Sequence, residues 1–109
     1  MIMHLKKDGI PIERDTANVE SVTPDGDNCH IHFFSGETIR YSYGLKDFER
    51  AYCIGTELMR AHRKYVINFT KVVKAWCYIA ITENKKKFDL GRKAYKKVKA
   101  YLIKKYSGK

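Results

Sequence analysis

The chain has 109 residues, of which 44% are hydrophobic and 13% aromatic, and a formal net charge of +10. This length predicts a single domain over residues 1–109, and the hydrophobic content excludes a disordered chain. No apolar run is long enough for a signal peptide or a membrane span, so the sequence predicts a cytoplasmic protein without a membrane partner.

The first segments of the chain are predicted to form β strands. The segment "HLKKDGIPIERD" carries a turn at Asp8-Gly9 between two short strands. The segment "NVESV" places Val19 and Val22 on another strand, which the turn-forming residues of "TPDGDN" are expected to end.

A hairpin and a short helix are predicted next. In "CHIHFF", the side chains of Cys29, Ile31 and Phe33 share one face of a strand. The turn "SGE" leads to the alternating strand "TIRYSY", so Cys29–Tyr43 is predicted to be a hairpin. The segment "GLKDFERAYC" changes to helical spacing. Its apolar stripe comprises Leu45, Phe48, Ala51 and Tyr52.

The segment "LMRAHRKYVINFTKVV" places a dense cationic cluster, Arg60 to Lys64, directly before the apolar strand Tyr65–Ile67. Because the middle of this strand is apolar, we expect the cations to project from the loop that leads into it. The runs "VVKAWCYIAIT" and "KFDL" flank the turn "ENKKK" and are predicted to form another hairpin. A lysine-rich helix is predicted from Arg92 to the end. Its apolar ridge comprises Tyr95, Val98, Leu102 and Tyr106.

The basic residues are concentrated in the second half of the chain. Residues 1–55 carry six Lys or Arg and nine Asp or Glu, a balance of −3. Residues 56–109 carry sixteen Lys or Arg and three Asp or Glu, a balance of +13. Because solvated surfaces usually mix the two signs, this segregation favours a polyanionic partner, and nucleic acid before an anionic membrane.

The sequence predicts no metal site and no cofactor. His30 and His32 share a strand face, but no third ligand with a fixed relation to them is visible. The three cysteines, Cys29, Cys53 and Cys77, lack the spacing of a disulfide framework or a zinc site. We therefore expect them to be free, buried thiols.

The sequence also predicts no catalytic residues. Cys53 or Cys77 could pair with His62 as nucleophile and base, but no group that would activate the thiol or orient the base is visible. The common nucleotide-binding, hydrolase and metalloprotease motifs are absent from the sequence. An enzyme is therefore not expected.

Two cationic segments remain as candidate sites for nucleic acid. The arginines of "RAHRKYVIN" can form a fork onto a phosphate or a guanine edge, and Asn68 could hydrogen-bond locally or reach a base. Arg92 and Lys93 open the last helix, whose first N–H groups favour a nearby phosphate. Two cationic loops and a lysine-rich helix would form a stripe along a duplex.

Two alternatives stay open at this point. The aromatic residues could stack single-stranded DNA or RNA on a small sheet, although their strand and helix periodicity explains most of them equally well as core. The basic half could instead bind an acidic protein partner.

In these segments the sequence resembles the LytTR DNA-binding domains of bacterial response regulators. "RAHRKYVIN", Arg60 to Asn68, is similar to the central signature R-x-H-R-S-Y-x-V-N of this family, and the similarity continues through Lys71-Val72. "LGRKAYKKVKAYL" is similar to the family's closing I-S-R-R-x-x-K-K-L. Upstream, "NVESV", "GETIRYSYGLKDFE" and "ELMRAH" follow the family's order, so the resemblance covers a core of residues 5–102.

The resemblance implies an elongated, mainly β fold of antiparallel sheets, with short helices and a basic C-terminal helix. It also implies a transcription regulator of two-component systems that binds repeated sites in double-stranded DNA, with loops inserted into successive major grooves. No receiver domain precedes the motif, which implies either a stand-alone regulator or an excised domain. A stand-alone regulator would be controlled by its expression level, by a homodimer on DNA or by a regulatory protein partner.

The resemblance also implies which residues contact DNA. Arg63 and Arg92 are expected to contact base edges, and Lys96 and Lys97 to anchor phosphates in a salt-sensitive manner. The full set carried over by motif comprises His62, Arg63, Lys64, Arg92 and Lys93.

The first DNA-facing loop of the family corresponds to Pro24–Cys29, with Asn28 as the candidate contact. This chain departs from the family at two places. Lys64 stands where the family usually has serine, which adds positive charge, and Asp25 and Asp27 bring negative charge into the first loop.

Overall fold

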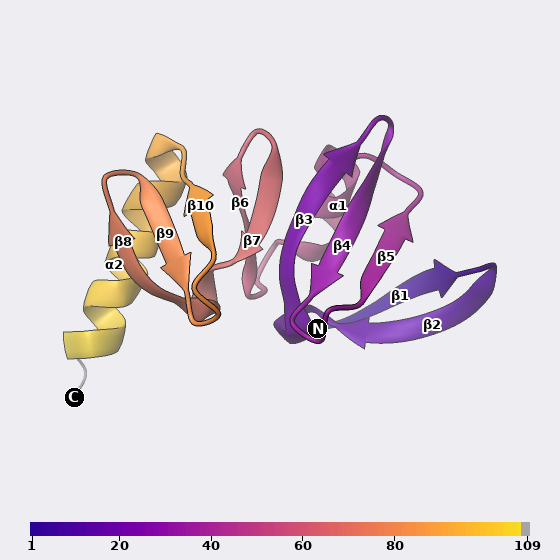
Figure 1. Cartoon of the computed structure of the whole chain (residues 1–109), viewed down its shortest axis with the longest axis horizontal. Coiled ribbons are helices and arrows are strands. Elements are labelled where there is room, and N and C mark those ends of the chain that lie inside the picture. Colours follow the sequence, from indigo (N-terminus) through magenta and orange to yellow (C-terminus); the bar gives the residue numbers. More distant parts are fainter. Residues whose placement is uncertain (108–109) are drawn as a thin grey trace.

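Residues 1–107, which the structure describes, form three antiparallel β sheets and two α helices in this computed structural model (Figure 1). The sheets follow one another along a body of 45 × 27 × 24 Å, so the molecule is elongated. The predicted mainly β fold with short helices and a basic C-terminal helix is therefore confirmed. Among the described residues, no helix has the length and apolar character that a membrane span requires.

The N-terminal hairpin pairs β1 (Ile2–Lys7) with β2 (Ile10–Asp15). Its turn has positive φ angles at Asp8 (53°) and Gly9 (78°), a region that Gly enters freely and Asp tolerates. The predicted turn is therefore confirmed. The hairpin buries Met3 and Leu5 in the core of the neighbouring sheet.

The central sheet has the strand order β5-β4-β3-β7-β6. Its five strands are β3 (Val19–Asp25), β4 (Asn28–Phe33), β5 (Thr38–Tyr41), β6 (Leu58–His62) and β7 (Tyr65–Asn68). Two short 3-10 helices, η1 (Thr16–Asn18) and η2 (Phe69–Lys71), lead into β3 and out of β7. The predicted β4–β5 hairpin is confirmed, and its alternation buries Cys29, Ile31 and Phe33.

Helix α1 (Leu45–Tyr52) covers one face of the central sheet. Leu45 and Phe48 are buried, and Tyr52 packs partly buried against them. Ala51 was expected on the same apolar stripe, but it is exposed. The side of α1 that faces the sheet carries Leu45, Phe48 and Tyr52, and Ala51 lies at the border of this side.

Strand β3 is longer than predicted, because "TPDGDN" does not end it. Thr23, Pro24 and Asp25 continue the pairing with β4 as far as the turn at Gly26-Asp27. A proline fits here because β7 pairs only with Ser21 and Val22 of β3. No strand therefore pairs with β3 at Pro24 on the side away from β4, and on that side no backbone hydrogen bond is lost because proline lacks an N–H group.

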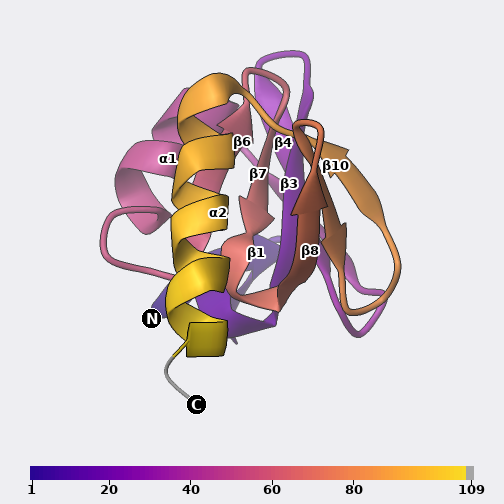
Figure 2. The ribbon, with the colours of Figure 1, turned by 90° about the vertical axis from the view of Figure 1, so that its left-hand side faces the viewer.

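The C-terminal sheet has the order β10-β9-β8 and comprises β8 (Val72–Trp76), β9 (Ile79–Thr82) and β10 (Lys87–Asp89). The predicted hairpin across "ENKKK" is confirmed as the β9–β10 pair. The run "VVKAWCYIAIT", expected as one side of this hairpin, is instead divided by the turn at Cys77-Tyr78 into β8 and β9, which pair with each other. Helix α2 (Arg92–Ser107) lies against one face of this sheet (Figure 2). Ala94 and Val98 of α2 are buried there together with Val72 and Ala80.

Two hydrophobic cores result, and β7 takes part in both. Val66 faces the core beneath α1, and Ile67 faces the core beneath α2, because successive residues of a strand point to opposite sides. A polar contact also joins the sheets. Glu20 of β3, only 5% exposed, accepts hydrogen bonds from Asn84 Nδ2 and Lys86 Nζ, both at 2.6 Å.

The cysteines only partly match the expectation of buried thiols. Cys29 is buried and Cys53 is half-buried, and burial raises the thiol pKa to about 11 and about 12 respectively. Cys77 is exposed because it lies in the turn between β8 and β9, so the prediction of a buried thiol is wrong for this residue.

Glu37, between β4 and β5, attaches the N-terminal hairpin to the central sheet. Its carboxylate accepts hydrogen bonds from Arg14 Nε at 2.8 Å, Arg14 Nη2 at 3.0 Å and Lys7 Nζ at 3.0 Å. The bonds from Arg14 first, and then the bond from Lys7, lower the pKa of Glu37 from 4.5 to about 2. A carboxylate of this kind stabilises the fold above its unfolded pKa, and this stabilisation is lost as the pH falls through the folded pKa.

We therefore expect the free energy of unfolding to fall more steeply with decreasing pH in the wild type than in Glu37→Gln. The difference should develop between about pH 5 and pH 2, because only the wild type takes up a proton at this site on unfolding. Chemical denaturation followed by circular dichroism at a series of pH values measures it. Glu13→Gln, which removes an exposed carboxylate that faces His4 on the same hairpin, is the control for the loss of a surface carboxylate. Equal slopes for the wild type and Glu37→Gln would contradict the assignment.

Candidate nucleic-acid interface

The cationic cluster of the sequence lies on the β6–β7 hairpin. Arg60 and His62 belong to strand β6, so the prediction that the whole cluster forms a loop is wrong; only Arg63 and Lys64 form the turn. The side chains of Arg63 and Lys64 are exposed there. The hairpin thus presents two cations at its tip and keeps the others along its strand.

Arg60 holds the turn in place. Its guanidinium donates from Nε to His62 O at 2.9 Å, from Nη2 to Arg63 O at 2.6 Å and from Nη1 to Glu49 Oε1 at 3.2 Å. One planar group therefore bridges two carbonyls of the turn and a carboxylate of α1, a geometry that the rigid fork of arginine can satisfy and an ammonium cannot. Arg60 is a positioning residue, and its charge is partly neutralised by Glu49.

His62 is half-buried and fixed in orientation. Its ring stacks on Tyr65 with centroids 5.3 Å apart and an interplanar angle of 22°, and its Nδ1 accepts a hydrogen bond from Lys64 N at 3.3 Å. Tyr65 is held in turn, since its hydroxyl donates to Asp89 O at 2.5 Å. One side of the imidazole is thereby occupied by protein.

The start of α2 lies beside the β6–β7 hairpin. Gly91 N donates to Ala61 O at 2.8 Å, which joins the residue before α2 to the middle of β6. Arg92 and Lys93, the first two residues of α2, are exposed. This bond brings two segments that are distant in the sequence, and the four cations that they carry, to the same part of the molecule.

The next turn of α2 extends the cationic surface. Lys96 and Lys97 are exposed and lie one turn after Arg92 and Lys93, on the same sides of the helix. We call this surface the recognition edge. It comprises Arg63, Lys64, Arg92, Lys93, Lys96 and Lys97.

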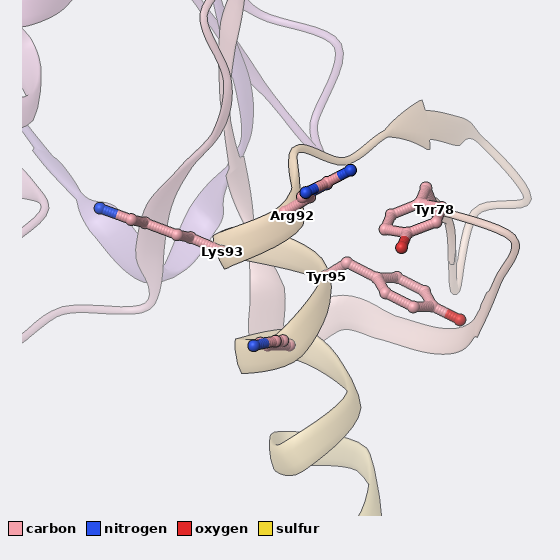
Figure 3. Close-up of a pocket in the computed structure, with 5 residues that line it drawn as sticks. Tyr78, Arg92, Lys93 and Tyr95 are labelled. Atoms are coloured by element: carbon pink, nitrogen blue, oxygen red, sulfur yellow. The ribbon is translucent and has the colours of Figure 1, made fainter.

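A pocket at the recognition edge includes a residue that the sequence did not indicate (Figure 3). Arg92 extends toward Tyr78, whereas Lys93 points the opposite way. The rings of Tyr78 and Tyr95 pack with centroids 4.5 Å apart, and Tyr78 remains 51% exposed. Tyr78 was missed because it lies in the β8–β9 turn, whose two residues have positive φ angles without the usual Gly or Asn.

Asn68 lies in the core and not at the recognition edge. Its side chain is 0% exposed: Nδ2 donates to Ala17 O at 3.1 Å, and Oδ1 accepts from Thr70 N at 3.1 Å and from Thr70 Oγ1 at 2.6 Å. Of the two roles considered for Asn68, local hydrogen bonding is the one that the structure shows. Burial leaves it no route to a base, so we leave Asn68 out of the interface.

Asn28 begins β4, directly after the β3–β4 turn. Its amide lies between Ser42 O, to which it can donate at 3.0 Å, and Arg40 Nη2, from which it can accept at 2.6 Å. Figure 1 shows the β3–β4 turn on the same long edge of the molecule as the β6–β7 turn and the start of α2. Of the acidic residues near this turn, Asp25 faces His30 Nε2 at 3.2 Å.

Comparison with known proteins shows the family and the fold of the chain. A family model described as the LytTr DNA-binding domain matches residues 12–103. Among solved structures, the chain is similar to the LytTr DNA-binding domain of a protein described as a methyl-accepting/DNA response regulator from Bacillus cereus. The TM-score is 0.64 and the sequence identity 16%, over 94% of each chain. None of the curated proteins compared with the chain matches it.

A mainly β domain with cationic side chains gathered on one edge has the features of a nucleic-acid-binding domain. The chain belongs to the LytTr DNA-binding domain family, whose model covers most of its length. It is accordingly a DNA-binding domain. The resemblance noted in the sequence is thus confirmed.

The role of Arg60 can be tested by replacing it with lysine. Arg60→Lys keeps the charge but cannot reach both carbonyls and Glu49, so we expect a loss of stability of about 1–2 kcal/mol. The turn should also loosen, and amide hydrogen exchange should become faster at Arg63 and Lys64 than in the wild type. Arg50→Lys, on the exposed side of α1, is the matched control and should change neither quantity. Unchanged exchange at the turn in Arg60→Lys would show that the turn holds its shape without the guanidinium.

Proposed function

We propose that the recognition edge binds double-stranded DNA in a sequence-specific manner, with the β6–β7 turn and the start of α2 inserted into the major groove. The hydrogen bond between Gly91 N and Ala61 O carries this proposal, because it fixes both cationic segments side by side. Exposed turns on a rigid sheet suit a groove, which a flat surface cannot enter.

The roles of the side chains differ within the proposed interface. Arg63 and Arg92 are exposed, and their guanidinium groups suit the two parallel bonds that a guanine edge accepts. Lys64, Lys93, Lys96 and Lys97 are point charges suited to phosphates, which supply affinity but little specificity. His62, held by Tyr65, would contact the duplex with the exposed part of its ring.

The length of the molecule supports contact with more than one groove segment. The body is 45 Å long, and one turn of B-DNA rises about 34 Å. The β3–β4 turn with Asn28 lies on the same edge, so it could contact the duplex beyond the recognition edge. Because the chain belongs to the LytTr DNA-binding domain family, we also propose, from the resemblance noted in the sequence and not from this length, repeated sites in the target DNA that more than one copy of the chain occupies.

The packing of the aromatic residues favours duplex DNA over single strands. Tyr41, Phe48 and Tyr52 contact one another in the core beneath α1, and Tyr65 packs on Phe88 in the other core. Rings engaged in this way are not available as the open stacking platform that single-strand binders use. Trp76 and Tyr78 are exposed, but they lie in and beside the β8–β9 turn, and Tyr78 packs on Tyr95.

A competition experiment distinguishes these partners. A labelled duplex selected from a random pool should be displaced by unlabelled duplex of the same sequence, and far less by oligo(dT) or transfer RNA. The physical reason is that the proposed base contacts need the fixed shape of the major groove, which a flexible single strand does not have. Displacement by oligo(dT) or transfer RNA as strong as by the duplex would overturn the proposal in favour of single-strand binding.

Substitutions within the recognition edge should separate specificity from affinity. Arg63→Ala or Arg92→Ala should relax the preference at one base pair each, with a loss of about 1–3 kcal/mol of discrimination. Lys97→Ala should weaken binding to all sequences alike and lower the salt slope by about 1. Titrations across salt concentrations and site variants measure both effects. Lys6→Ala, on the N-terminal hairpin, is the matched control and should leave both unchanged. The reverse pattern would refute the assignment of roles.

A further inference from the structure

The C-terminal sheet has one face that α2 does not cover, which we call the outer face. Paired residues of an antiparallel sheet point to the same side, so the register of the strands defines this face as two rows. One row comprises Lys74, Ile81 and Lys87. The other row comprises Trp76, Ile79 and Asp89.

The sequence of β9 does not fit a strand with one solvated face. Antiparallel strands of that kind alternate apolar and polar residues, whereas β9 has Ile79, Ala80 and Ile81 in succession. Ala80 is buried beneath α2, which leaves the two isoleucines on the other side. Apolar residues on both faces are typical of strands that are covered on both faces.

The outer face is open in the structure. Figure 2 shows α2 on one side of the C-terminal sheet, and no element formed by residues 1–107 lies over the other side. Trp76 is 64% exposed, and Lys74 and Lys87 are exposed as well. Ile79 and Ile81 are only half-buried, between these longer side chains.

We propose that the outer face binds an acidic segment of a protein partner that also carries aliphatic or aromatic side chains. Ile79, Ile81 and Trp76 would bury the apolar side chains of the segment. Lys74 and Lys87 flank Ile81 on its two sides and would pair with carboxylates. This inference concerns a different surface from the recognition edge and does not depend on the proposed mode of DNA binding.

Other occupants fit the outer face less well. Phosphates would leave the two isoleucines in contact with charged, hydrated groups and would gain nothing from burying them. A second copy of the chain would bring another net charge of +10 to a face with two exposed lysines. An acidic partner with apolar side chains fits best: its carboxylates would pair with the row of Lys74 and Lys87, and its apolar side chains would cover Trp76 and Ile79. The one carboxylate of the two rows, Asp89, is outnumbered by the two lysines.

The only tryptophan of the chain lies on the outer face, so its fluorescence reports directly on binding. The probe is a synthetic peptide in which Leu and Phe alternate with Asp and Glu. We expect a saturable blue shift of Trp76 emission and protection from acrylamide quenching. A peptide with the same carboxylates but Ser in place of Leu and Phe should bind at least about tenfold more weakly.

Variants of the outer face complete the test. The double variant with Ile79→Thr and Ile81→Thr keeps β-branched residues in β9 and should bind the peptide at least about tenfold more weakly, with unchanged affinity for duplex DNA. Ile10→Thr, which changes another exposed isoleucine in a strand, should bind both like the wild type. Circular dichroism of each variant checks that the fold is kept.

Several results would overturn the inference. They are an absent spectral change with the acidic apolar peptide, an equal response to the Ser-substituted peptide, and unchanged peptide binding by the Ile79 and Ile81 variant. A concentration-dependent blue shift without peptide, with a dimer in sedimentation, would assign the outer face to a second copy. Loss of duplex binding in the folded variant would assign it to DNA.

Discussion

The position of the cationic side chains depends on a main-chain hydrogen bond, and on the packing around it, between segments that are far apart in the sequence. Gly91 N donates to Ala61 O, so β6 and the junction before α2 are held together at backbone level. The cations that follow each segment are then exposed in the same part of the molecule. Their mutual repulsion would favour the opposite arrangement. Backbone pairing and core packing, and not electrostatics, therefore gather the charge.

The rigidity of this arrangement comes from the strand shared by the two cores. Val66 and Ile67 of β7 face different cores, and α2 packs in the core that contains Ile67, so this strand links the packing of α2 to the central sheet. Glu20 adds a polar constraint, because it is almost completely buried and bonded to Asn84 and Lys86 across the sheets. Removing either partner would leave a buried carboxylate incompletely paired, which is unfavourable. The recognition edge is thus held by the packing of β7 in the two cores and by the hydrogen bonds of Glu20 between the two sheets.

Local patterns were sufficient to predict most of the strands, while tertiary contacts decided the exceptions. Alternation identified the β4–β5 hairpin, and the Asp8-Gly9 turn has the residues that its positive φ angles require. The β8–β9 turn has Cys77 and Tyr78 at such angles, and the bond from Leu90 N to Tyr78 O at 2.7 Å helps to hold it. No local pattern indicates a contact of this kind.

In the candidate site too, local sequence patterns predicted some features and tertiary contacts decided the others. Charge density located Arg63, Lys64, Arg92 and Lys93 correctly at exposed positions, because only their place in turns and helix starts had to be predicted. Arg60 has the same charge, yet three acceptors turn it inward as a support for the turn. Asn68 could have served either role by residue type, and only its burial decides between them.

The excess of lysine in the second half of the chain links the two proposed surfaces. Every lysine within about a Debye length of the recognition edge adds to the field that attracts the duplex. Lys74 and Lys87 belong to the same C-terminal sheet that supports α2, so carboxylates bound beside them would reduce that field. A partner on the outer face would then weaken DNA binding at low salt without touching the recognition edge. By reciprocity, bound DNA would weaken the partner by the same factor.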